Sequence, residues 1–165
     1  WADGLRGQSF DKVLENAVEF LNGTGNKFFD YVDKIIQILK PTHDIYFITG
    51  EPDFVGRAAA LHFLIKDSLS AELEIKDGFF TGKIKRQLAR KEEKLEVIST
   101  LLKDYPRENS LAFGDSEGDM EMLNSVQYAI CVNATDGLKK YALEKNWNLS
   151  QPEEVEALVK SILKL

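Results

Sequence analysis

The chain has a single cysteine and no apolar run of membrane-spanning length. One cysteine cannot form a disulfide within the chain, and Cys131 lies in the apolar run Tyr-Ala-Ile-Cys-Val, so we predict a buried, reduced thiol. A helix needs about 20 consecutive apolar residues to cross a bilayer, and no signal peptide is recognisable. We therefore predict no membrane span and a cytoplasmic location.

The chain has fewer positively charged than negatively charged residues. The chain carries 21 Lys and Arg against 27 Asp and Glu, which gives a net charge of -6. The densest basic run, Lys83 to Lys91, is closed by Glu92 and Glu93, and we interpret it as solvated surface. Because nucleic-acid-binding domains carry basic patches, the sequence predicts no nucleic-acid partner.

The chain also lacks an initiator methionine. It begins at Trp1, and its two methionines are Met120 and Met122. A bulky residue such as Trp in the second position would keep its methionine. We therefore expect the sequence to be the C-terminal portion of a longer protein.

Helical and strand patterns alternate along the chain, which is long enough and apolar enough (44% hydrophobic) for a packed core. Apolar residues recur at helical spacing over residues 10–21, 27–39, 54–64, 91–103 and 135–144, and again after Pro152, which we place at the first helical position. Apolar runs of strand length occur at 44–50, 71–75, 79–84, 111–113 and 128–132, with a hairpin turn at 76–78. This alternation predicts an α/β fold with a mostly parallel sheet and helices on both faces. The first two helices precede any strand and are interpreted as an appendage and a connector.

Two carboxylates follow the strand at 111–113. Asp115 comes directly after Gly114, and Asp119 lies on the turn that opens the next helix. Ligand sites of open α/β sheets lie at the carboxyl ends of strands, and two neighbouring acids repel unless a cation or proton lies between them. Mg²⁺, which prefers oxygen ligands, would suit this place. The alternative is a helix start, in which Asp115 or Ser116 is the N-cap and Glu117 and Asp119 favour the helix dipole.

Two further polar groups are candidates for binding an anion. Thr49 and Gly50 end the strand at 44–50, and a hydroxyl with bare backbone N–H groups can bind a phosphate, although Thr-Gly is also a common turn. Lys94 opens the helix that precedes Asp115. Its ammonium either points to the strand ends or is a solvated lysine at a helix start.

The order of these motifs resembles the haloacid dehalogenase superfamily, in its phosphoserine-phosphatase-like branch. Phe47-Ile48-Thr49-Gly50 resembles the second motif of that family, Lys94 its third-motif lysine, and the stretch from Gly114 to Asp119 its acidic fourth motif. The hairpin at 74–83 and residues 142–147 are also similar to that branch. The resemblance covers nearly the whole chain.

The resemblance implies a Rossmann-like sheet with a helical cap. Residues 1–40 would then be a partial cap and connector, and residues 41–165 the core. It implies a Mg²⁺-dependent hydrolase of small-molecule phosphomonoesters, in which an Asp nucleophile forms an aspartyl-phosphate that water hydrolyses. Asp115 would hold Mg²⁺, and Asp119 would complete or orient the water shell of the metal. Thr49, Gly50 and Lys94 would bind the phosphoryl oxygens.

The first motif of the family, Asp-x-Asp-x-Thr/Val after an apolar strand, has no counterpart in the 165 residues. No strand precedes Asp3, and the acids Asp30 and Asp33 are three apart within a helical pattern. In the family this motif lies on a central strand, between the strand that ends at Thr49 and the strand that ends at Gly114. We therefore interpret the chain as a catalytically incomplete piece of a phosphatase.

Alternatives remain open on both fold and function. The two strands that flank the absent one could close on each other in a rearranged sheet, or a strand could come from another chain. The protein could also be a non-catalytic descendant that binds phosphate and metal, or a phosphotransferase that moves the phosphoryl group to an alcohol.

Overall fold

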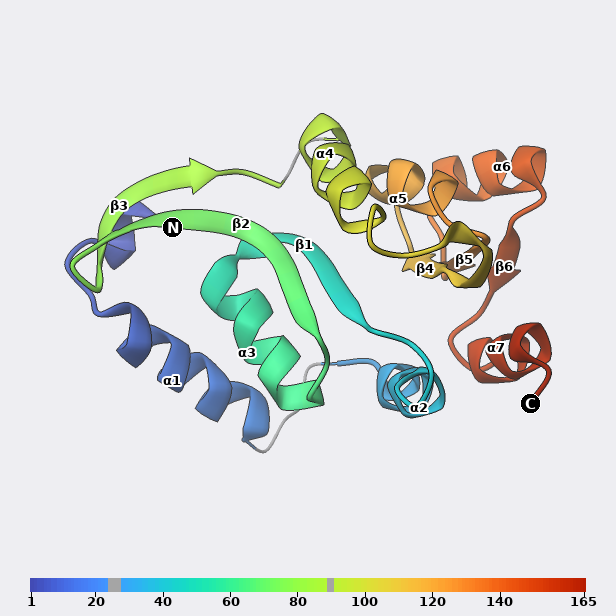
Figure 1. The fold of residues 1–165 in the computed structure, drawn as a ribbon, viewed down its shortest axis with the longest axis horizontal. Coiled ribbons are helices and arrows are strands. Elements are labelled where there is room, and N and C mark those ends of the chain that lie inside the picture. Colours follow the sequence, from blue (N-terminus) through green and yellow to red (C-terminus); the bar gives the residue numbers. More distant parts are fainter. Residues whose placement is uncertain (24–27, 89–90) are drawn as a thin grey trace. The chain divides into compact units, whose positions relative to one another are not determined.

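The computed structural model describes residues 1–23, 28–88 and 91–165 (Figure 1). The chain forms two compact units, which are described separately below. The first comprises Trp1–Phe28 and Ile36–Ala89, and the second Phe29–Ile35 and Arg90–Leu165. This division by packing is a different one from the predicted cap and core, whose boundary at residue 40 stays a prediction. The predicted helix start at Lys27 and the preceding turn residues 24–26 lie outside the described residues.

The first unit is built on a three-stranded sheet in the order β1-β2-β3, with β1 Tyr46–Pro52, β2 Asp67–Lys76 and β3 Phe79–Arg86. β1 and β2 are parallel, and β2 and β3 form the predicted antiparallel hairpin. Its turn uses Asp77 and Gly78, both with positive φ, which glycine adopts without strain. The remaining elements are a short 3-10 helix, η1 (Asp3–Leu5), and the helices α1 (Phe10–Asn22) and α3 (Asp53–Phe63).

α3 packs against β1 and β2, and α1 packs against α3. α3 approaches β2 closely at Gly56, because a Cβ there would lie 2.0 Å from the Ser70 hydroxyl. The core of the unit gathers Ala2, Val13, Leu73 and Phe80, with Leu5, Phe10 and Phe54 packed against it.

The second unit holds a three-stranded, all-parallel sheet in the order β4-β5-β6. Its strands are β4 Leu111–Gly114, β5 Tyr128–Val132 and β6 Asn148–Ser150. Its helices are α4 Lys91–Leu101, α5 Met120–Asn124, α6 Asp136–Lys145 and α7 Val155–Leu163, with 3-10 turns η2 (Arg107–Asn109) and η3 (Glu117–Asp119). The boundary between the units falls inside α2, Asp30–Leu39.

The core of the second unit surrounds Cys131. This thiol is free and fully buried, as predicted, among Leu123, Ala129, Leu138 and Ala142. Burial, and after it the negative charge of Asp119, raise the pKa of the Cys131 thiol to about 11. None of the described helices has the length and apolar content of a membrane-spanning helix.

The strands of the described residues form two sheets of three, so the two strands predicted to flank the absent one do not pair with each other in a rearranged sheet. A sheet continues only where a strand pairs on both of its sides, and both β1 and β4 stand at the end of their strand order. The parallel β1–β2, β4–β5 and β5–β6 pairs do confirm the α/β class with mostly parallel pairing.

Two local predictions also differ from the structure. The apolar pattern predicts no strand at β6, because Asn148 and Ser150 break the apolar run, although both residues pair with β5. Pro152 was placed at the first position of the last helix, yet α7 begins at Val155. A turn comes first, in which the N–H groups of Glu154 and Val155 donate to the Gln151 carbonyl at 3.0 and 3.1 Å.

Candidate active site at the end of β4

The loop after β4 is shaped by a glycine at the end of the strand. β4 pairs with β5 from Leu111 to Gly114, and Asp115 follows at once. A Cβ on Gly114 would lie 2.7 Å from the Asp119 Cβ, closer than real carbon contacts allow. Glycine at position 114 therefore lets the Asp119 side chain fold back over the end of the strand.

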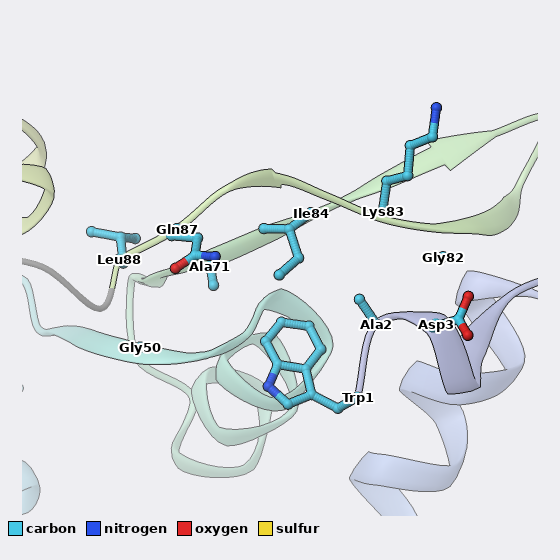
Figure 2. A pocket seen from close by; sticks show the side chains of 10 residues that line it. All are labelled: Trp1, Ala2, Asp3, Gly50, Ala71, Gly82, Lys83, Ile84, Gln87 and Leu88. Carbon is cyan, nitrogen blue, oxygen red and sulfur yellow. The ribbon is translucent and has the colours of Figure 1, made fainter.

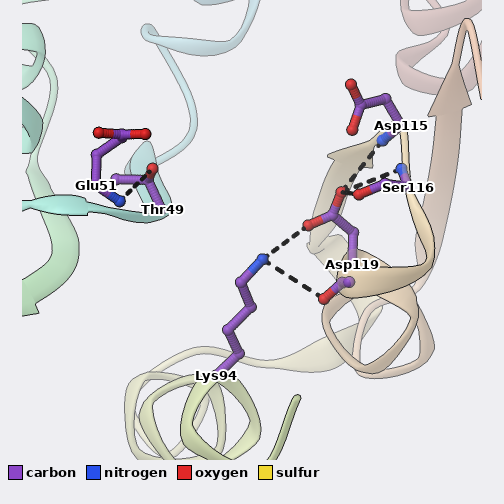
Figure 3. A network of polar contacts seen from close by, with 7 residues as sticks. Thr49, Glu51, Lys94, Asp115, Ser116 and Asp119 are labelled. Carbon is purple, nitrogen blue, oxygen red and sulfur yellow. Dashed lines mark hydrogen bonds and ion pairs between the residues drawn. The ribbon is translucent and has the colours of Figure 1, made fainter. Parts of the chain in front are cut away.

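The Asp119 carboxylate ties this loop together (Figure 3). Its Oδ2 accepts hydrogen bonds from the backbone N–H groups of Asp115 at 3.2 Å and Ser116 at 3.4 Å, and from the Ser116 hydroxyl at 3.3 Å. Ser116 is the N-cap of η3, and it forms a reciprocal capping box with Asp119. The alternative of a helix start with Ser116 as N-cap is therefore correct for the local structure.

Lys94 supplies the positive charge that balances Asp119. From the first turn of α4, its ammonium donates to Asp119 Oδ1 at 3.2 Å and to the Gly118 carbonyl at 3.5 Å. The side chains of Lys94 and Asp119 are each only 15% exposed. Lys94 is therefore held at the loop that follows β4 and is not a solvated lysine.

Asp115 is an exposed acid of the loop. Within the described part of the chain, its carboxylate forms no hydrogen bond or ion pair, and Figure 3 shows it pointing away from Asp119. Tyr31, on the first turn of α2, interacts electrostatically with the Asp115 carboxylate. Burial of the phenol raises the pKa of Tyr31, and the negative charge of Asp115 raises it further.

This donor set fits Mg²⁺ in part. Mg²⁺ in proteins is commonly held by one or two carboxylates, with phosphate oxygens and waters completing its shell. Asp115 offers one such carboxylate, whereas the Asp119 oxygens are already engaged by four donors. No group of three or more His, Cys, Asp or Glu side chains suited to a metal occurs among residues 1–23, 28–88 and 91–165. Further ligands would have to come from the substrate, from water or from other residues.

Thr49 and Gly50 lie in the first unit, within β1. The Thr49 hydroxyl oxygen accepts a hydrogen bond from the Glu51 N–H at 3.1 Å. The hydroxyl hydrogen is still free to donate in that arrangement. The structure thus groups Thr49 with Gly50, and Lys94 with Asp115 and Asp119. The convergence of these two groups on one anion stays a prediction.

Gly50 also borders a cavity of about 720 Å³ within the first unit. Figure 2 shows the Trp1 ring and the Ile84 side chain on opposite sides of it, with Gln87 nearby and the Lys83 ammonium directed away. Apart from Gly50, the residues that line this cavity are not among the site residues predicted from the sequence. The alternation of β3 gives no signal for them, because its pairing with β2 shifts register between Phe80 and Ile84 and Gly82 has a positive φ.

A family model, described as haloacid dehalogenase-like hydrolase, matches residues 4–124. A Mycobacterium leprae protein, named only as a hydrolase, is 26% identical over 145 residues, which are 81% of this chain and 48% of that protein. Phosphoserine phosphatase SerB1 of Mycobacterium tuberculosis is 24% identical over 127 residues, 75% of this chain and 41% of the enzyme. The chain therefore spans less than half the length of these relatives.

Solved structures share the fold at low sequence identity. A protein of unknown function from Bordetella pertussis matches with a TM-score of 0.73 and 20% identity, over 88% of this chain and 68% of that one. A phosphoserine phosphatase in its apo form matches with a TM-score of 0.64 and 18% identity, over 99% of this chain and 76% of that one. The family match over residues 4–124, which is more than half of the chain, establishes that the chain belongs to the haloacid dehalogenase-like hydrolases.

Proposed function

We propose that the protein is a Mg²⁺-dependent phosphomonoester hydrolase of the phosphoserine-phosphatase-like kind. In this proposal its nucleophile is an aspartate supplied by a segment outside these 165 residues. The observation that carries the proposal is the partly buried Lys94–Asp119 pair beside the exposed Asp115, at the carboxyl end of β4. A phosphoserine phosphatase solved as a phospho-aspartyl intermediate analogue has the same fold, with a TM-score of 0.65.

Each residue of the site has a defined task in this proposal. Asp115 holds Mg²⁺, which when bound neutralises charge on the phosphate and on the attacking carboxylate. The Lys94 ammonium has three N–H donors, of which Asp119 and Gly118 take two. The third donor is available to a phosphoryl oxygen. Asp119 is then a positioning residue, because it fixes both the ammonium and the N–H group of Asp115.

Thr49 and Gly50 donate to the remaining equatorial oxygens of the phosphoryl group. The Thr49 hydroxyl keeps a free hydrogen, since its hydrogen bond with Glu51 uses only the oxygen. Charge on these oxygens must be stabilised in the transition state, and loss of one such donor typically costs on the order of 3 kcal/mol in the barrier. The leaving group would lie in the cavity that Gly50 borders.

The chemistry needs a carboxylate that none of these residues provides. An aspartate oxygen attacks phosphorus, the P–O bond to the substrate alcohol breaks, and a second acid gives the alcohol its proton. Water then hydrolyses the acyl phosphate, which releases inorganic phosphate and restores the carboxylate. No Asp-x-Asp occurs in the 165 residues, and in the family this motif lies on a central strand. The end positions of β1 and β4 in their sheets support a missing strand, because unpaired edges are normally covered or paired.

The test compares the 165-residue chain with the complete protein, using p-nitrophenyl phosphate and Mg²⁺. The chain alone should not hydrolyse this substrate, whereas the complete protein should, and removal of Mg²⁺ with EDTA should stop it. Asp115→Asn in the complete protein should lower the rate by at least about 100-fold. Asp104→Asn, a change at another exposed aspartate of the second unit, should leave the rate unchanged.

Two results would contradict the proposal. Turnover by the chain alone that Asp115→Asn abolishes would mean that the nucleophile is within these residues. A complete protein that binds Mg²⁺ and phosphate but has no Asp-x-Asp and no turnover would be the non-catalytic binder instead.

A further inference from the structure

The loop that carries Asp115 is held from a second side, by the start of α6. The backbone N–H of Thr135 donates to the Asp115 carbonyl at 2.8 Å. The Thr135 hydroxyl donates to Glu117 Oε2 at 3.0 Å and accepts a weaker hydrogen bond from the Leu138 N–H at 3.4 Å. We call these contacts of Thr135 with Asp115 and Glu117 the Thr135 clamp.

Gly137 makes room for the Glu117 carboxylate. A Cβ at position 137 would lie 1.9 Å from Glu117 Oε1 and 2.8 Å from its Cδ. The carboxylate therefore lies directly against the first turn of α6, where the helix dipole favours a negative charge. No side chain larger than that of glycine could occupy position 137 unless Glu117 moved away.

The contacts exceed what capping of α6 requires. A helix N-cap needs only the hydrogen bond between the Thr135 hydroxyl and an N–H of the first turn, here that of Leu138. The shorter contact reaches Glu117, which precedes Thr135 by 18 residues and lies on a different element. Capping also gives no reason for a glycine at position 137, where alanine would favour the helix.

We propose that Thr135 and Glu117 are positioning residues for Asp115. This proposal rests on the proposed function, in which Asp115 is a Mg²⁺ ligand. Asp119 fixes the N–H group of Asp115, and Thr135 fixes its carbonyl. Because both ends of the residue are held, the position of the Asp115 backbone and the direction of its Cα–Cβ bond are set before any ligand arrives. The Glu117 contact keeps the loop and the start of α6 together.

The experiment uses three variants of the complete protein: Thr135→Val, Thr135→Ser and Gly137→Ala. Valine removes the hydroxyl, serine keeps it, and alanine displaces Glu117 while every charge stays in place. The matched control is Thr100→Val, which removes an exposed hydroxyl of α4 that bonds to the Glu96 carbonyl. Two quantities are measured for each variant: the Mg²⁺ concentration for half-maximal activation, and the Mg²⁺ titration of the backbone amide NMR shifts at 115–119.

Thr135→Val and Gly137→Ala should raise both Mg²⁺ constants by about 10-fold, as is typical when a group that orients a metal ligand is lost. Thr135→Ser and Thr100→Val should stay within about twofold of the original protein. The KM for the phosphomonoester at saturating Mg²⁺ should not change. Gly137→Ala is the decisive variant, because a purely structural role of α6 predicts a neutral or stabilising effect of alanine there.

The proposal is overturned if Gly137→Ala leaves both Mg²⁺ constants unchanged, or if serine at 135 fails as badly as valine. Should Thr135→Val lose its helical circular dichroism, the Gly137→Ala result decides. Asp115→Asn distinguishes a failure of the Thr135 clamp from a failure of the proposed function. If that change does not alter the Mg²⁺ constants, then the proposed function is wrong. If it abolishes binding while Gly137→Ala has no effect, then only the clamp is wrong.

Discussion

Replacing Lys94 by methionine should destabilise the second unit, and the loss measures how much the Lys94–Asp119 ion pair contributes to its stability. Methionine keeps much of the length and the apolar stem of lysine but removes the ammonium, which donates to Asp119 Oδ1 at 3.2 Å. The Asp119 carboxylate would keep the donors on Asp115 and Ser116. It would lose the positive charge of Lys94, with which it forms an ion pair.

The magnitude follows from the geometry. At 3.2 Å and an effective dielectric constant of 20, Coulomb's law gives about 5 kcal/mol of attraction before desolvation is subtracted. Fully buried pairs cost about 3–5 kcal/mol to break, and exposed pairs contribute about 0–1 kcal/mol. With both side chains 15% exposed, we expect a coupling free energy of roughly 2 kcal/mol between Lys94 and Asp119.

The assay is a double-mutant cycle in urea with Lys94→Met, Asp119→Asn and the double variant. Fluorescence of Trp147, which packs against the core of the second unit, reports unfolding there. The control is Lys160→Met, since Lys160 pairs with Glu156 at 2.6 Å but is 47% exposed. That change should cost less than about 1 kcal/mol. A coupling free energy below about 0.5 kcal/mol for Lys94 and Asp119, within the range of exposed pairs, would refute the reasoning.

Two further predictions concern titratable groups that have no task in the proposed reaction. Since the pKa of Cys131 is raised to about 11, only about one thiol in a thousand is ionised at pH 8. Iodoacetamide should therefore react much more slowly with the folded chain than with the urea-unfolded chain. Equal reaction rates would contradict the burial of this thiol. Burial of the Asp53 side chain raises its pKa, despite the hydrogen bond from the Phe54 N–H. The charged form is therefore disfavoured in the folded state, and the stability of the original chain should fall as the pH rises through the raised pKa. Asp53→Asn should consequently have a higher urea midpoint than the original chain at pH 7, and the same midpoint below the ordinary pKa of 3.8. A lower midpoint for Asp53→Asn at pH 7 would contradict this prediction.

The elements of the fold could largely be predicted from local patterns. The run Tyr128–Val132 is recognisable as a strand from its apolar residues alone, and α1 follows from the apolar spacing at Val13, Leu14 and Ala17. β6 could not be recognised in this way, because Asn148 and Ser150 pair with β5 through backbone groups that any residue carries. The separation into two sheets depends on which strands pair, and pairing between distant segments leaves no local pattern.

The candidate site could be predicted only in part for the same reason. The positions of Asp115 and Asp119 follow from the end of a strand and the start of a helix, and the resemblance to the family pointed to Lys94. That Lys94 engages Asp119, and that Asp115 remains exposed, depends on how α4 packs near the loop. The role of Gly137 could not be foreseen, since its neighbour Glu117 lies 20 residues earlier.

The central claim is that Thr49, Lys94 and Asp115 surround one phosphoryl group with its Mg²⁺. A crystal structure of the complete protein with Mg²⁺ and beryllium fluoride, a mimic of the phosphoryl group, tests it most directly. We expect an Asp115 carboxylate oxygen at about 2.1 Å from Mg²⁺, with the Lys94 ammonium and the Thr49 hydroxyl within hydrogen-bond distance of the fluorides. A Mg²⁺ ion bound without Asp115, or a fluoride group that neither Lys94 nor Thr49 contacts, would contradict it.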